Sequence, residues 1–375
     1  MSWNIPVSER CRKIDASGIR KVFDLAAKRK AQGADLVDFS IGQPDFPVPE
    51  AIKAAAIAAI RADKNAYTVT QGIDSLRAKI AGQFKARFGS DPEGVLITSG
   101  ASGGLVLLFL ATCQTGDEVI MMDPYFVMYK HLATLAGATS VIVDSYPDFK
   151  LDAGKIAKAI TPRTKVLLLN SPSNPTGCVY GDAELKAVAE LARKHNLLVV
   201  SDEIYQSLSY DGEVPSIVKY IPERTLVVDG YSKKLALTGW RLGYAAGPKE
   251  LIEQMAKLQQ YTFVCAPSFA QYAAMEMDAF DLKATVDDYR RRRDLIYSGL
   301  KDRFQVVKPS GGFYIFPEVP GGCAKAFCEK AMEKDVLIIP GSVFSEKDTH
   351  FRISYARDEA TIRKGIERLN QLADG

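Results

Sequence analysis

Runs of apolar residues alternate with helical patterns through the middle of the chain. The runs are rich in Val, Ile and Leu, and they cover residues 94–100, 117–123, 165–172, 197–203 and 224–230. Because they are almost continuously apolar rather than alternating, we expect strands that are covered on both faces. Amphipathic segments such as 181–196 lie between them. This alternation predicts an α/β fold with a mostly parallel, doubly wound sheet flanked by helices.

The pattern changes after about residue 266. A long charged helix is expected over 282–304, followed by short strands at 311–319 and 350–356 and helices at 323–334 and 359–372. This mixture predicts a smaller α+β unit. The N-terminal segment, with a helix expected over 17–33, should pack with it. We therefore expect a large domain at 43–275 and a small domain made of 1–42 and 276–375.

Charge and composition exclude several classes of protein. The chain has 375 residues with 48 basic and 45 acidic side chains, a net charge of +3, so it offers no electrostatic case for binding nucleic acid or an anionic membrane. The basic run at 289–297 has aspartates around it, which is typical of a solvated helix face.

Targeting and metal signals are missing from the sequence. No apolar stretch approaches the ~20 residues of a membrane span, and the first residues do not resemble a secretory signal. With six scattered cysteines and three histidines, a metal site is not expected. We expect a cytoplasmic protein.

Ligands of open α/β sheets bind beyond the carboxyl ends of the strands, and the residues that follow the predicted strands suit this role. The small-residue turn SGASGG at 99–104 opens a helix, where backbone N–H groups and the helix dipole favour a phosphate. The turn has neither dinucleotide-binding nor P-loop spacing. By itself such a turn is more often a plain turn than a phosphate site.

Two later strand ends also carry polar residues. Asn170 and Asn174 lie in a proline-bearing loop, either of which could aim an amide inward, and Asp202 lies at a strand tip with Tyr205 one turn away. Each has a structural alternative, a turn for the loop and a helix cap for the carboxylate.

The last strand of the series, at 224–230, is followed by Lys233 and, eight residues later, by Arg241. A lysine in a closed site loses hydration, so its pKa falls and the neutral amine becomes a nucleophile. An arginine in the same pocket could bind a phosphate. An isolated Lys-Lys pair is usually surface charge. Here the convergence with the other strand ends favours a reactive lysine.

At this point the chain resembles the class I/II aminotransferases of pyridoxal-phosphate fold type I, in the aspartate-aminotransferase-like subgroup with the signature S-K-x-x-x-x-T-G-W-R-x-G. The motifs that carry the resemblance occur in order along almost the whole chain: IGQPDF, AYTVTQGIDSLR, SGASGG, PYFVMY, NSPSNPTG, SDEIY, YSKKLALTGWRLG, PSGGFYIF and FRISYA. The resemblance implies a seven-stranded sheet with a smaller α+β domain. It also implies ping-pong transfer of an amino group between an L-amino acid and a 2-oxo acid in amino acid metabolism.

The resemblance assigns roles around the cofactor pyridoxal 5′-phosphate. Lys233 would form its aldimine and shuttle the proton, with Lys234 a bystander. Asp202 would face the pyridine nitrogen, Tyr205 and Asn174 the phenolate oxygen, and Phe126 the ring. The residues implied to hold the phosphate are Gly100, Ala101, Ser102, Ser232 and Arg241.

Two further roles come from the resemblance alone. Tyr67 would reach the phosphate of the neighbouring subunit, which implies a homodimer with shared sites. Arg352 would bind the substrate α-carboxylate beside Gly42 and Asn174.

Substrate choice and reaction type stay open. Ser102 stands where relatives specialised for aspartate can have a lysine, which argues against strict dicarboxylate specificity. A carbon–sulfur β-lyase on the same scaffold is the main alternative to an aminotransferase. A cofactor-sensing transcription regulator is disfavoured, because only ~40 residues precede the large domain and they contain no recognisable two-helix DNA reader.

Overall fold

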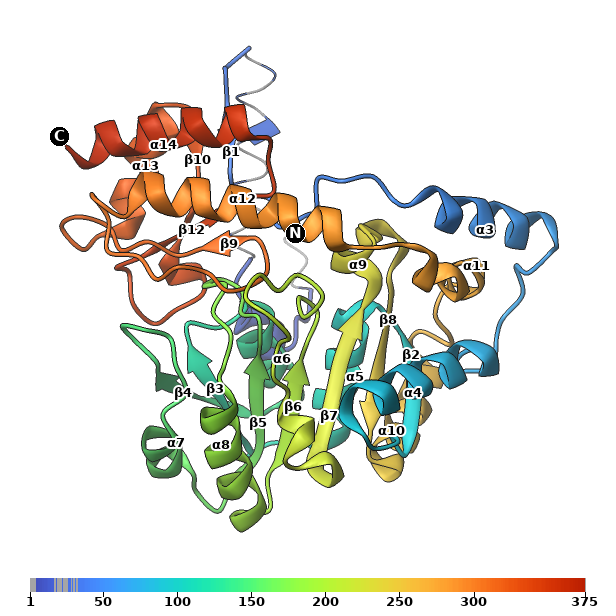
Figure 1. Cartoon of the computed structure of the whole chain (residues 1–375). Coiled ribbons are helices and arrows are strands. Elements are labelled where there is room, and N and C mark those ends of the chain that lie inside the picture. The colour runs from blue at the N-terminus through green and yellow to red at the C-terminus, as the bar shows by residue number, and fades with distance from the viewer. Residues whose placement is uncertain are drawn as a thin grey trace.

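The computed structural model describes residues 5–16, 18, 22, 26–27, 29, 31 and 33–374. The helix expected over 17–33 lies largely outside the described residues. Figure 1 shows a large sheet with helices on both faces and, above it, a smaller unit built mainly from the C-terminal part of the chain.

The large sheet has seven strands in the order β2-β8-β7-β6-β5-β3-β4. Only β8 runs against its neighbours, and all other adjacent pairs are parallel. The fold class predicted from the sequence is therefore confirmed. The strands are β2 (Gly94–Ser99), β3 (Glu118–Asp123), β4 (Thr139–Asp144), β5 (Thr164–Asn170), β6 (Leu198–Asp202), β7 (Thr225–Gly230) and β8 (Leu242–Gly247).

Two strands of this sheet were not predicted. The strand β4 lies at the sheet edge and is only partly buried, so its pattern lacks a long apolar run. The strand β8 has the sequence LGYAAG, whose small residues have low strand propensity. Its glycines are needed, because a Cβ on Gly243 would lie 2.5 Å from the backbone nitrogen of Ala101.

Helices cover both faces of the sheet. Apolar side chains of α5 (Gly100–Thr112), α6 (Met128–Ala136) and α10 (Lys249–Thr262) share one core cluster with the strands. Those of α7 (Ala153–Ala159) and α8 (Asp182–Lys194) share a second cluster with the opposite face. This two-sided cover explains why the strands are apolar throughout.

A third cluster lies at the β2 end of the sheet, where the helices α3 (Glu50–Arg61), α4 (Asp74–Phe88) and α11 (Ser268–Ala273) pack together. Short helical segments complete this part of the chain: α1 (Glu9–Arg12), α9 (Tyr231–Lys234), η1 (Ile217–Lys219), η2 (Pro222–Arg224), η3 (Thr238–Trp240) and η4 (Ala274–Ala279).

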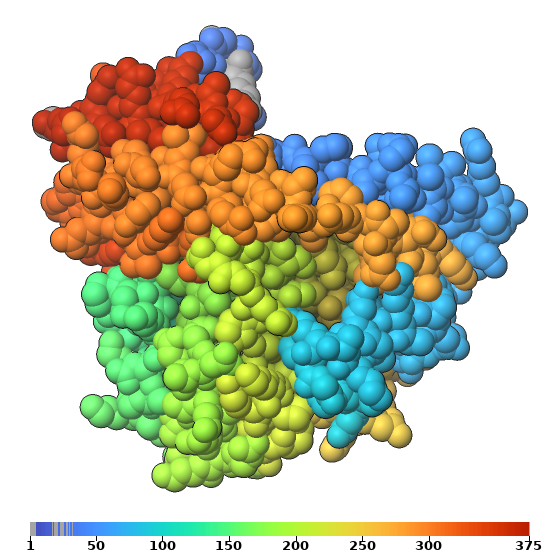
Figure 2. Space-filling view, viewed as in Figure 1, coloured from blue at the N-terminus to red at the C-terminus, as the bar shows by residue number. Residues whose placement is uncertain are grey.

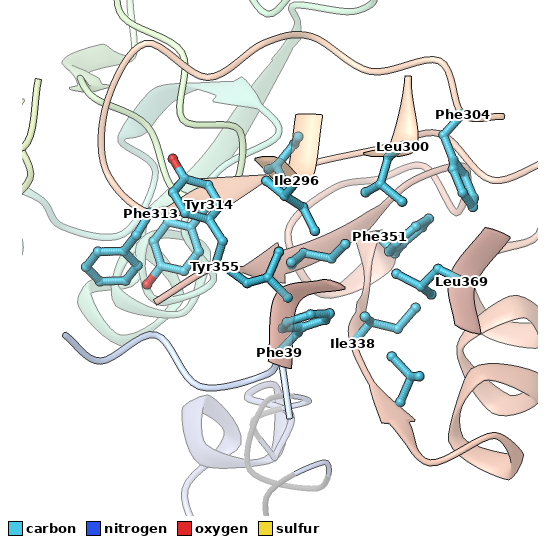
Figure 3. Close-up of a cluster of buried hydrophobic side chains, with 14 of the residues drawn as sticks. Phe39, Ile296, Leu300, Phe304, Phe313, Tyr314, Ile338, Phe351, Tyr355 and Leu369 are labelled. Atoms are coloured by element: carbon cyan, nitrogen blue, oxygen red, sulfur yellow. The ribbon is translucent and has the colours of Figure 1, made fainter. Parts of the chain in front are cut away.

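The C-terminal unit combines a three-stranded antiparallel sheet, β11-β12-β9, with a short parallel pair, β1-β10. Its elements are β1 (Val37–Asp38), α12 (Lys283–Leu300), β9 (Tyr314–Ile315), α13 (Ala324–Glu333), β10 (Val336–Leu337), β11 (Ile339–Pro340), η5 (Gly341–Val343), β12 (Phe351–Ser354) and α14 (Glu359–Ala373). Phe39, just after β1, joins the apolar cluster of this unit (Figure 3). The exact division into domains at residues 42 and 275 stays a prediction.

The C-terminal unit lies over the carboxyl edge of the large sheet. Figure 1 shows the arrows of β5, β6 and β7 pointing toward it, and Figure 2 shows its surface meeting the large sheet's part of the molecule. Within the described residues, no helix has the length and apolarity to cross a membrane. The same residues contain no group of three His, Cys, Asp or Glu side chains placed to hold a metal ion.

Candidate active site

A cavity of about 280 Å³ lies where the carboxyl edge of the large sheet meets the C-terminal unit. Most of the site residues expected from the sequence line it: Gly42, Ala101, Ser102, Phe126, Asn174, Asp202, Tyr205, Ser232, Lys233, Arg241 and Arg352. Its volume is near the lower end of the range for small-molecule sites.

Lys233 reaches this cavity from α9, the short helix that follows β7. Its Nζ donates a hydrogen bond of 2.7 Å to the Gly42 carbonyl oxygen. Burial lowers the pKa of Lys233 to about 8, and the positive charges of Arg352 and Arg241 act in the same direction. A substantial fraction of its amine is therefore neutral near pH 8, as a nucleophile requires.

Lys234 faces a different environment, although it is the next residue. Its Nζ lies 3.4 Å from Asp229 Oδ2 and 4.7 Å from the ring centre of Tyr231. The ring of Tyr244 is also within reach, at 5.6 Å. Since only 13% of its side chain is exposed, Lys234 belongs to a buried ion pair and is not a solvated surface charge.

Asp202 ends β6 and is almost fully buried. Its Oδ2 accepts a 2.6 Å hydrogen bond from the Tyr129 hydroxyl, and its Oδ1 accepts one from the Ile204 N–H at 3.2 Å. Burial raises the pKa of Asp202 to about 6, and these two donors oppose the rise. Asp202 can therefore be ionised at neutral pH, as a partner for a positive charge in the cavity.

The two asparagines after β5 have different tasks. Asn170 uses its side chain to shape the loop, donating to the Asp202 carbonyl and accepting from the Asn174 N–H. Asn174 Oδ1 instead accepts a 3.2 Å hydrogen bond from Arg352 Nη1. Of the two, Asn174 has the side chain that meets a functional group across the cavity.

Arg352 lies on β12 and is 1% exposed. Besides its bond to Asn174, its Nη2 donates to the Ser40 carbonyl at 2.7 Å, while its Nε has no partner. Among the described residues, no carboxylate forms an ion pair with it. A buried guanidinium without a counter-ion is costly, so this group suits an incoming carboxylate.

The phosphate-type turn forms the N-terminus of α5. Gly100 has a φ of +71°, which favours glycine, and a Cβ there would lie 2.6 Å from Arg241 Nη2, so a side chain would also displace the guanidinium. The backbone of Arg241 is also in the left-handed region, with a φ of 54°. Its guanidinium donates to the carbonyls of Thr238 and Ser99. Gly100 itself shapes the turn and does not line the cavity.

Two aromatic residues expected in the site face the cavity, and a third does not. The Tyr205 hydroxyl lies 3.1 Å from that of Tyr314, and the Phe126 ring packs edge-on against Tyr129. Tyr67, between α3 and α4, is 84% exposed and does not line the cavity of its own chain.

The contacts that Tyr129 and Tyr314 make with polar groups of the cavity were not predicted from the sequence. Tyr129 lies three residues after Phe126, the spacing of one helical turn, and this was the available signal. Tyr314 lies two residues after Gly312 on a short strand and contacts Tyr205 and Arg352 only through the tertiary fold.

Comparisons with known proteins agree with this geometry. The family model for aminotransferase class I and II matches residues 34–369. The chain is 38% identical to a probable aspartate aminotransferase of Methanocaldococcus jannaschii, covering 98% of this chain and 99% of the relative. It is 39% identical to the aspartate/prephenate aminotransferase of Thermus thermophilus, with 98% of each covered.

Solved structures give the same result. The aspartate aminotransferase of Thermus thermophilus with maleate superposes with a TM-score of 0.93 at 38% identity, over 98% of this chain and 100% of that one. The aspartate aminotransferase of Thermotoga maritima has a TM-score of 0.95 at 32% identity, again over 98% and 100%. The resemblance seen in the sequence is confirmed, and the chain belongs to the class I and II aminotransferases.

Proposed function

We propose that this aminotransferase uses pyridoxal 5′-phosphate, held covalently by Lys233, to move an amino group between an L-amino acid and a 2-oxo acid. The observation that carries the proposal is the charge arrangement of the cavity. An amine with a pKa of about 8 lies in one cavity with a buried carboxylate, Asp202, and with two guanidinium groups. Among the described residues, neither guanidinium has a carboxylate partner.

The residues present fit the phosphate of this cofactor. Arg241 supplies a positive charge, and the N-terminus of the 13-residue helix α5 supplies backbone donors at Ala101 and Ser102. The absence of a Cβ at Gly100 lets the guanidinium approach this turn. Ser232, one residue before Lys233, adds a hydroxyl from the same wall of the cavity.

The residues also fit the cofactor ring. Asp202, kept anionic by Tyr129 and the Ile204 amide, matches a protonated pyridine nitrogen. Tyr205 and Asn174 offer polar groups for the phenolate oxygen, and Phe126 offers an apolar face. When bound, pyridoxal phosphate supplies an aldehyde carbon for the amino group and an electron-withdrawing ring for the Cα carbanion.

The chain's own residues then do three things. Arg352 binds the substrate carboxylate through its planar fork, beside Asn174 and Gly42. This contact orients the Cα–H bond toward Lys233. The Lys233 amine removes the proton from Cα and later donates a proton at the cofactor carbon that carries the amino group. A positioned base of this kind typically raises the reaction rate ~10²–10⁴-fold. The donor leaves as an oxo acid before the acceptor binds, which is ping-pong order.

We further propose a homodimer in which Tyr67 serves the neighbouring subunit. Tyr67 and Val69 are 84% and 59% exposed, and Tyr261 is 85% exposed. The Thr70 carbonyl near this loop accepts from Gln259 of α10, so the loop is held close to the helix that carries Tyr261. Exposed aromatic residues gathered in this way favour a protein partner. A cytoplasmic location stays a prediction from the sequence.

The carbon–sulfur lyase gains no support from the relatives reported above, whose names describe aminotransferases. The same names guide the donors to test. We propose a panel of aspartate, glutamate, alanine and aromatic amino acids against 2-oxoglutarate and pyruvate. Release of pyruvate and ammonia from cystathionine without an oxo acid would favour the lyase instead.

Borohydride reduction tests the assignment of the lysine. Cofactor-saturated protein is reduced, digested and analysed by peptide mass spectrometry, and we expect the cofactor adduct on Lys233 alone. An adduct on Lys234, or no adduct on a protein that transaminates, would contradict the proposal.

A further inference from the structure

Tyr314 lines the cavity and has no role in the function proposed above. It comes from β9, and Figure 3 shows its ring at the edge of the C-terminal apolar cluster, with its hydroxyl pointing away from the cluster. The hydroxyl lies 3.1 Å from the Tyr205 hydroxyl. Its ring lies 4.6 Å from Arg352 Cζ. One side chain therefore touches both the group proposed for the cofactor oxygen and the group proposed for the substrate carboxylate.

We propose that Tyr314 is a positioning residue with two separable parts: its hydroxyl donates to Tyr205 and aims the Tyr205 proton into the cavity, and its ring holds the Arg352 guanidinium in place. The inference rests on the proposed function, because it takes Tyr205 as the donor to the cofactor oxygen.

The two phenols carry one more proton than their shared hydrogen bond uses. Tyr205 and Tyr314 are 5% and 1% exposed, so neither hydroxyl is freely solvated. Two O–H groups share one hydrogen bond, and one proton is left over. A buried hydroxyl proton needs an acceptor, and the space next to both oxygens is the cavity. The pair therefore offers one hydrogen-bond donor to whatever the cavity binds.

The proposed function decides which phenol offers that proton. Tyr205 is taken as the donor to the cofactor oxygen, and a phenol has a single O–H proton, so the Tyr205 oxygen can only accept from Tyr314 across their 3.1 Å contact. The Tyr205 proton itself points into the cavity. Lys233, 5.7 Å from the Tyr205 ring centre, and Arg352, near the Tyr314 ring, are cations that face the pair.

The Tyr314 ring packs against the Arg352 guanidinium. Arg352 Cζ lies 4.6 Å from the Tyr314 ring centre and 4.7 Å from that of Phe344, so the guanidinium contacts two aromatic rings. Such rings attract a desolvated cation and restrict its rotation. With Nη1 and Nη2 already bonded to Asn174 and Ser40, the plane of the fork is set before any carboxylate arrives.

The backbone at Gly42 leaves room for the Tyr314 hydroxyl. A Cβ at Gly42 would lie 2.2 Å from the Tyr314 oxygen, too close for any side chain. The carbonyl of the same glycine accepts from Lys233. Tyr314 therefore contacts the segment that holds Lys233, as well as Tyr205 and Arg352.

The experiment uses three variants of the holoenzyme. Tyr314→Phe removes only the hydroxyl, Tyr314→Leu removes the ring as well, and Tyr355→Phe is the matched control. Tyr355 is equally buried, but its hydroxyl contacts Tyr210 and the Gly312 carbonyl, outside the cavity. We measure the pH at which the absorbance of the bound cofactor changes, together with KM and kcat for an amino donor.

For Tyr314→Phe we expect an upward shift of about 0.5 unit in the absorbance pKa, because a weakened Tyr205 donor stabilises the anionic cofactor oxygen less. KM should stay within about twofold, since the ring remains. For Tyr314→Leu we expect KM to rise about tenfold as Arg352 loses its support. Tyr355→Phe should match the unchanged protein in both measurements.

Equal titrations of Tyr314→Phe, Tyr355→Phe and the unchanged protein would overturn the inference and leave the proposed function intact. An unchanged protein that shows no bound-cofactor absorbance would refute the proposed function instead. If Tyr314→Leu does not fold, the titration of Tyr314→Phe decides alone.

Discussion

The two sides of α9 give consecutive lysines opposite electrostatic surroundings. On the cavity side, Lys233 bonds to a neutral carbonyl and lies near two arginines, and its pKa falls to about 8. On the opposite side, Lys234 is paired with Asp229 and packed against two tyrosine rings. Consecutive residues of a helix point about 100° apart, which is enough to send them into these separate environments.

The difference shows that the surroundings, and not the residue type, make a lysine reactive. Cations and burial on the cavity side disfavour the ammonium form of Lys233. The carboxylate of Asp229 is a partner for the ammonium form of Lys234. Asp202 in the same cavity acts in the opposite direction on the Lys233 pKa, but burial and the two arginines outweigh it, whereas Lys234 has a carboxylate in direct contact.

The largest expected effect comes from replacing each of the two lysines by alanine in a separate variant. Lys233→Ala should lower turnover by about 10⁴-fold, because both the covalent attachment and the proton transfer are lost. Lys234→Ala should keep turnover and the pH-dependent absorbance of the bound cofactor. Steady-state rates and spectra of the two variants provide the measurement. Equal losses in both would mean that the wrong amine was assigned.

A smaller effect is expected in stability, on the opposite side of α9. Among the described residues, Lys234→Ala leaves the buried Asp229 carboxylate with the Tyr244 hydroxyl and the Gly230 amide as its remaining partners. The free energy of unfolding should fall by about 3 kcal/mol, as for other broken buried ion pairs. Urea unfolding of the variant measures the change. Lys53→Ala, which breaks an exposed pair with Glu50, is the control, and its loss should stay below about 1 kcal/mol.

The smallest expected effect is the change in the rate of cofactor uptake with each pH unit. Because the Lys233 pKa is lowered to about 8, the neutral fraction of the amine rises about tenfold per pH unit below 8 and levels off above it. The rate at which cofactor-free protein takes up pyridoxal phosphate should follow this curve. By linkage, the lowered pKa destabilises cofactor-free protein below about pH 8, and this penalty is relieved as pH rises toward 10.5.

Uptake measured by absorbance in a stopped-flow instrument gives the profile. Lys234→Ala should have the same midpoint as the unchanged protein. A rate that still climbs tenfold per unit at pH 9 would indicate an amine with an ordinary lysine pKa and remove the contrast between the two sides.

The sequence predicted the fold where burial leaves a clear pattern. The strands β5, β6 and β7 are covered on both faces, so their apolar runs are continuous and their ends could be found. The residues after these ends, Asp202 and Lys233 among them, could then be proposed from topology alone. The strand β8 was missed because close backbone packing selects small residues there.

The rest of the site depends on contacts between distant parts of the chain. Arg352 and Phe126 were proposed only through resemblance, because a single arginine on a strand or a phenylalanine in a loop has no local signature. Tyr314 was not proposed at all. Its hydroxyl meets Tyr205, 109 positions away, and no periodicity along the chain encodes that meeting.

The stretch from Phe39 to Gly42 has a consequence for how the enzyme is made. It accepts hydrogen bonds from Ser354, Arg352 and Lys233, at its residues 39, 40 and 42 respectively. Translation must therefore pass Arg352 before the lysine can acquire its neighbours. A prematurely terminated product that lacks the last β-strand also lacks the Arg352 charge, one of the causes of the lowered Lys233 pKa, so we expect it to capture the cofactor less readily than the completed chain.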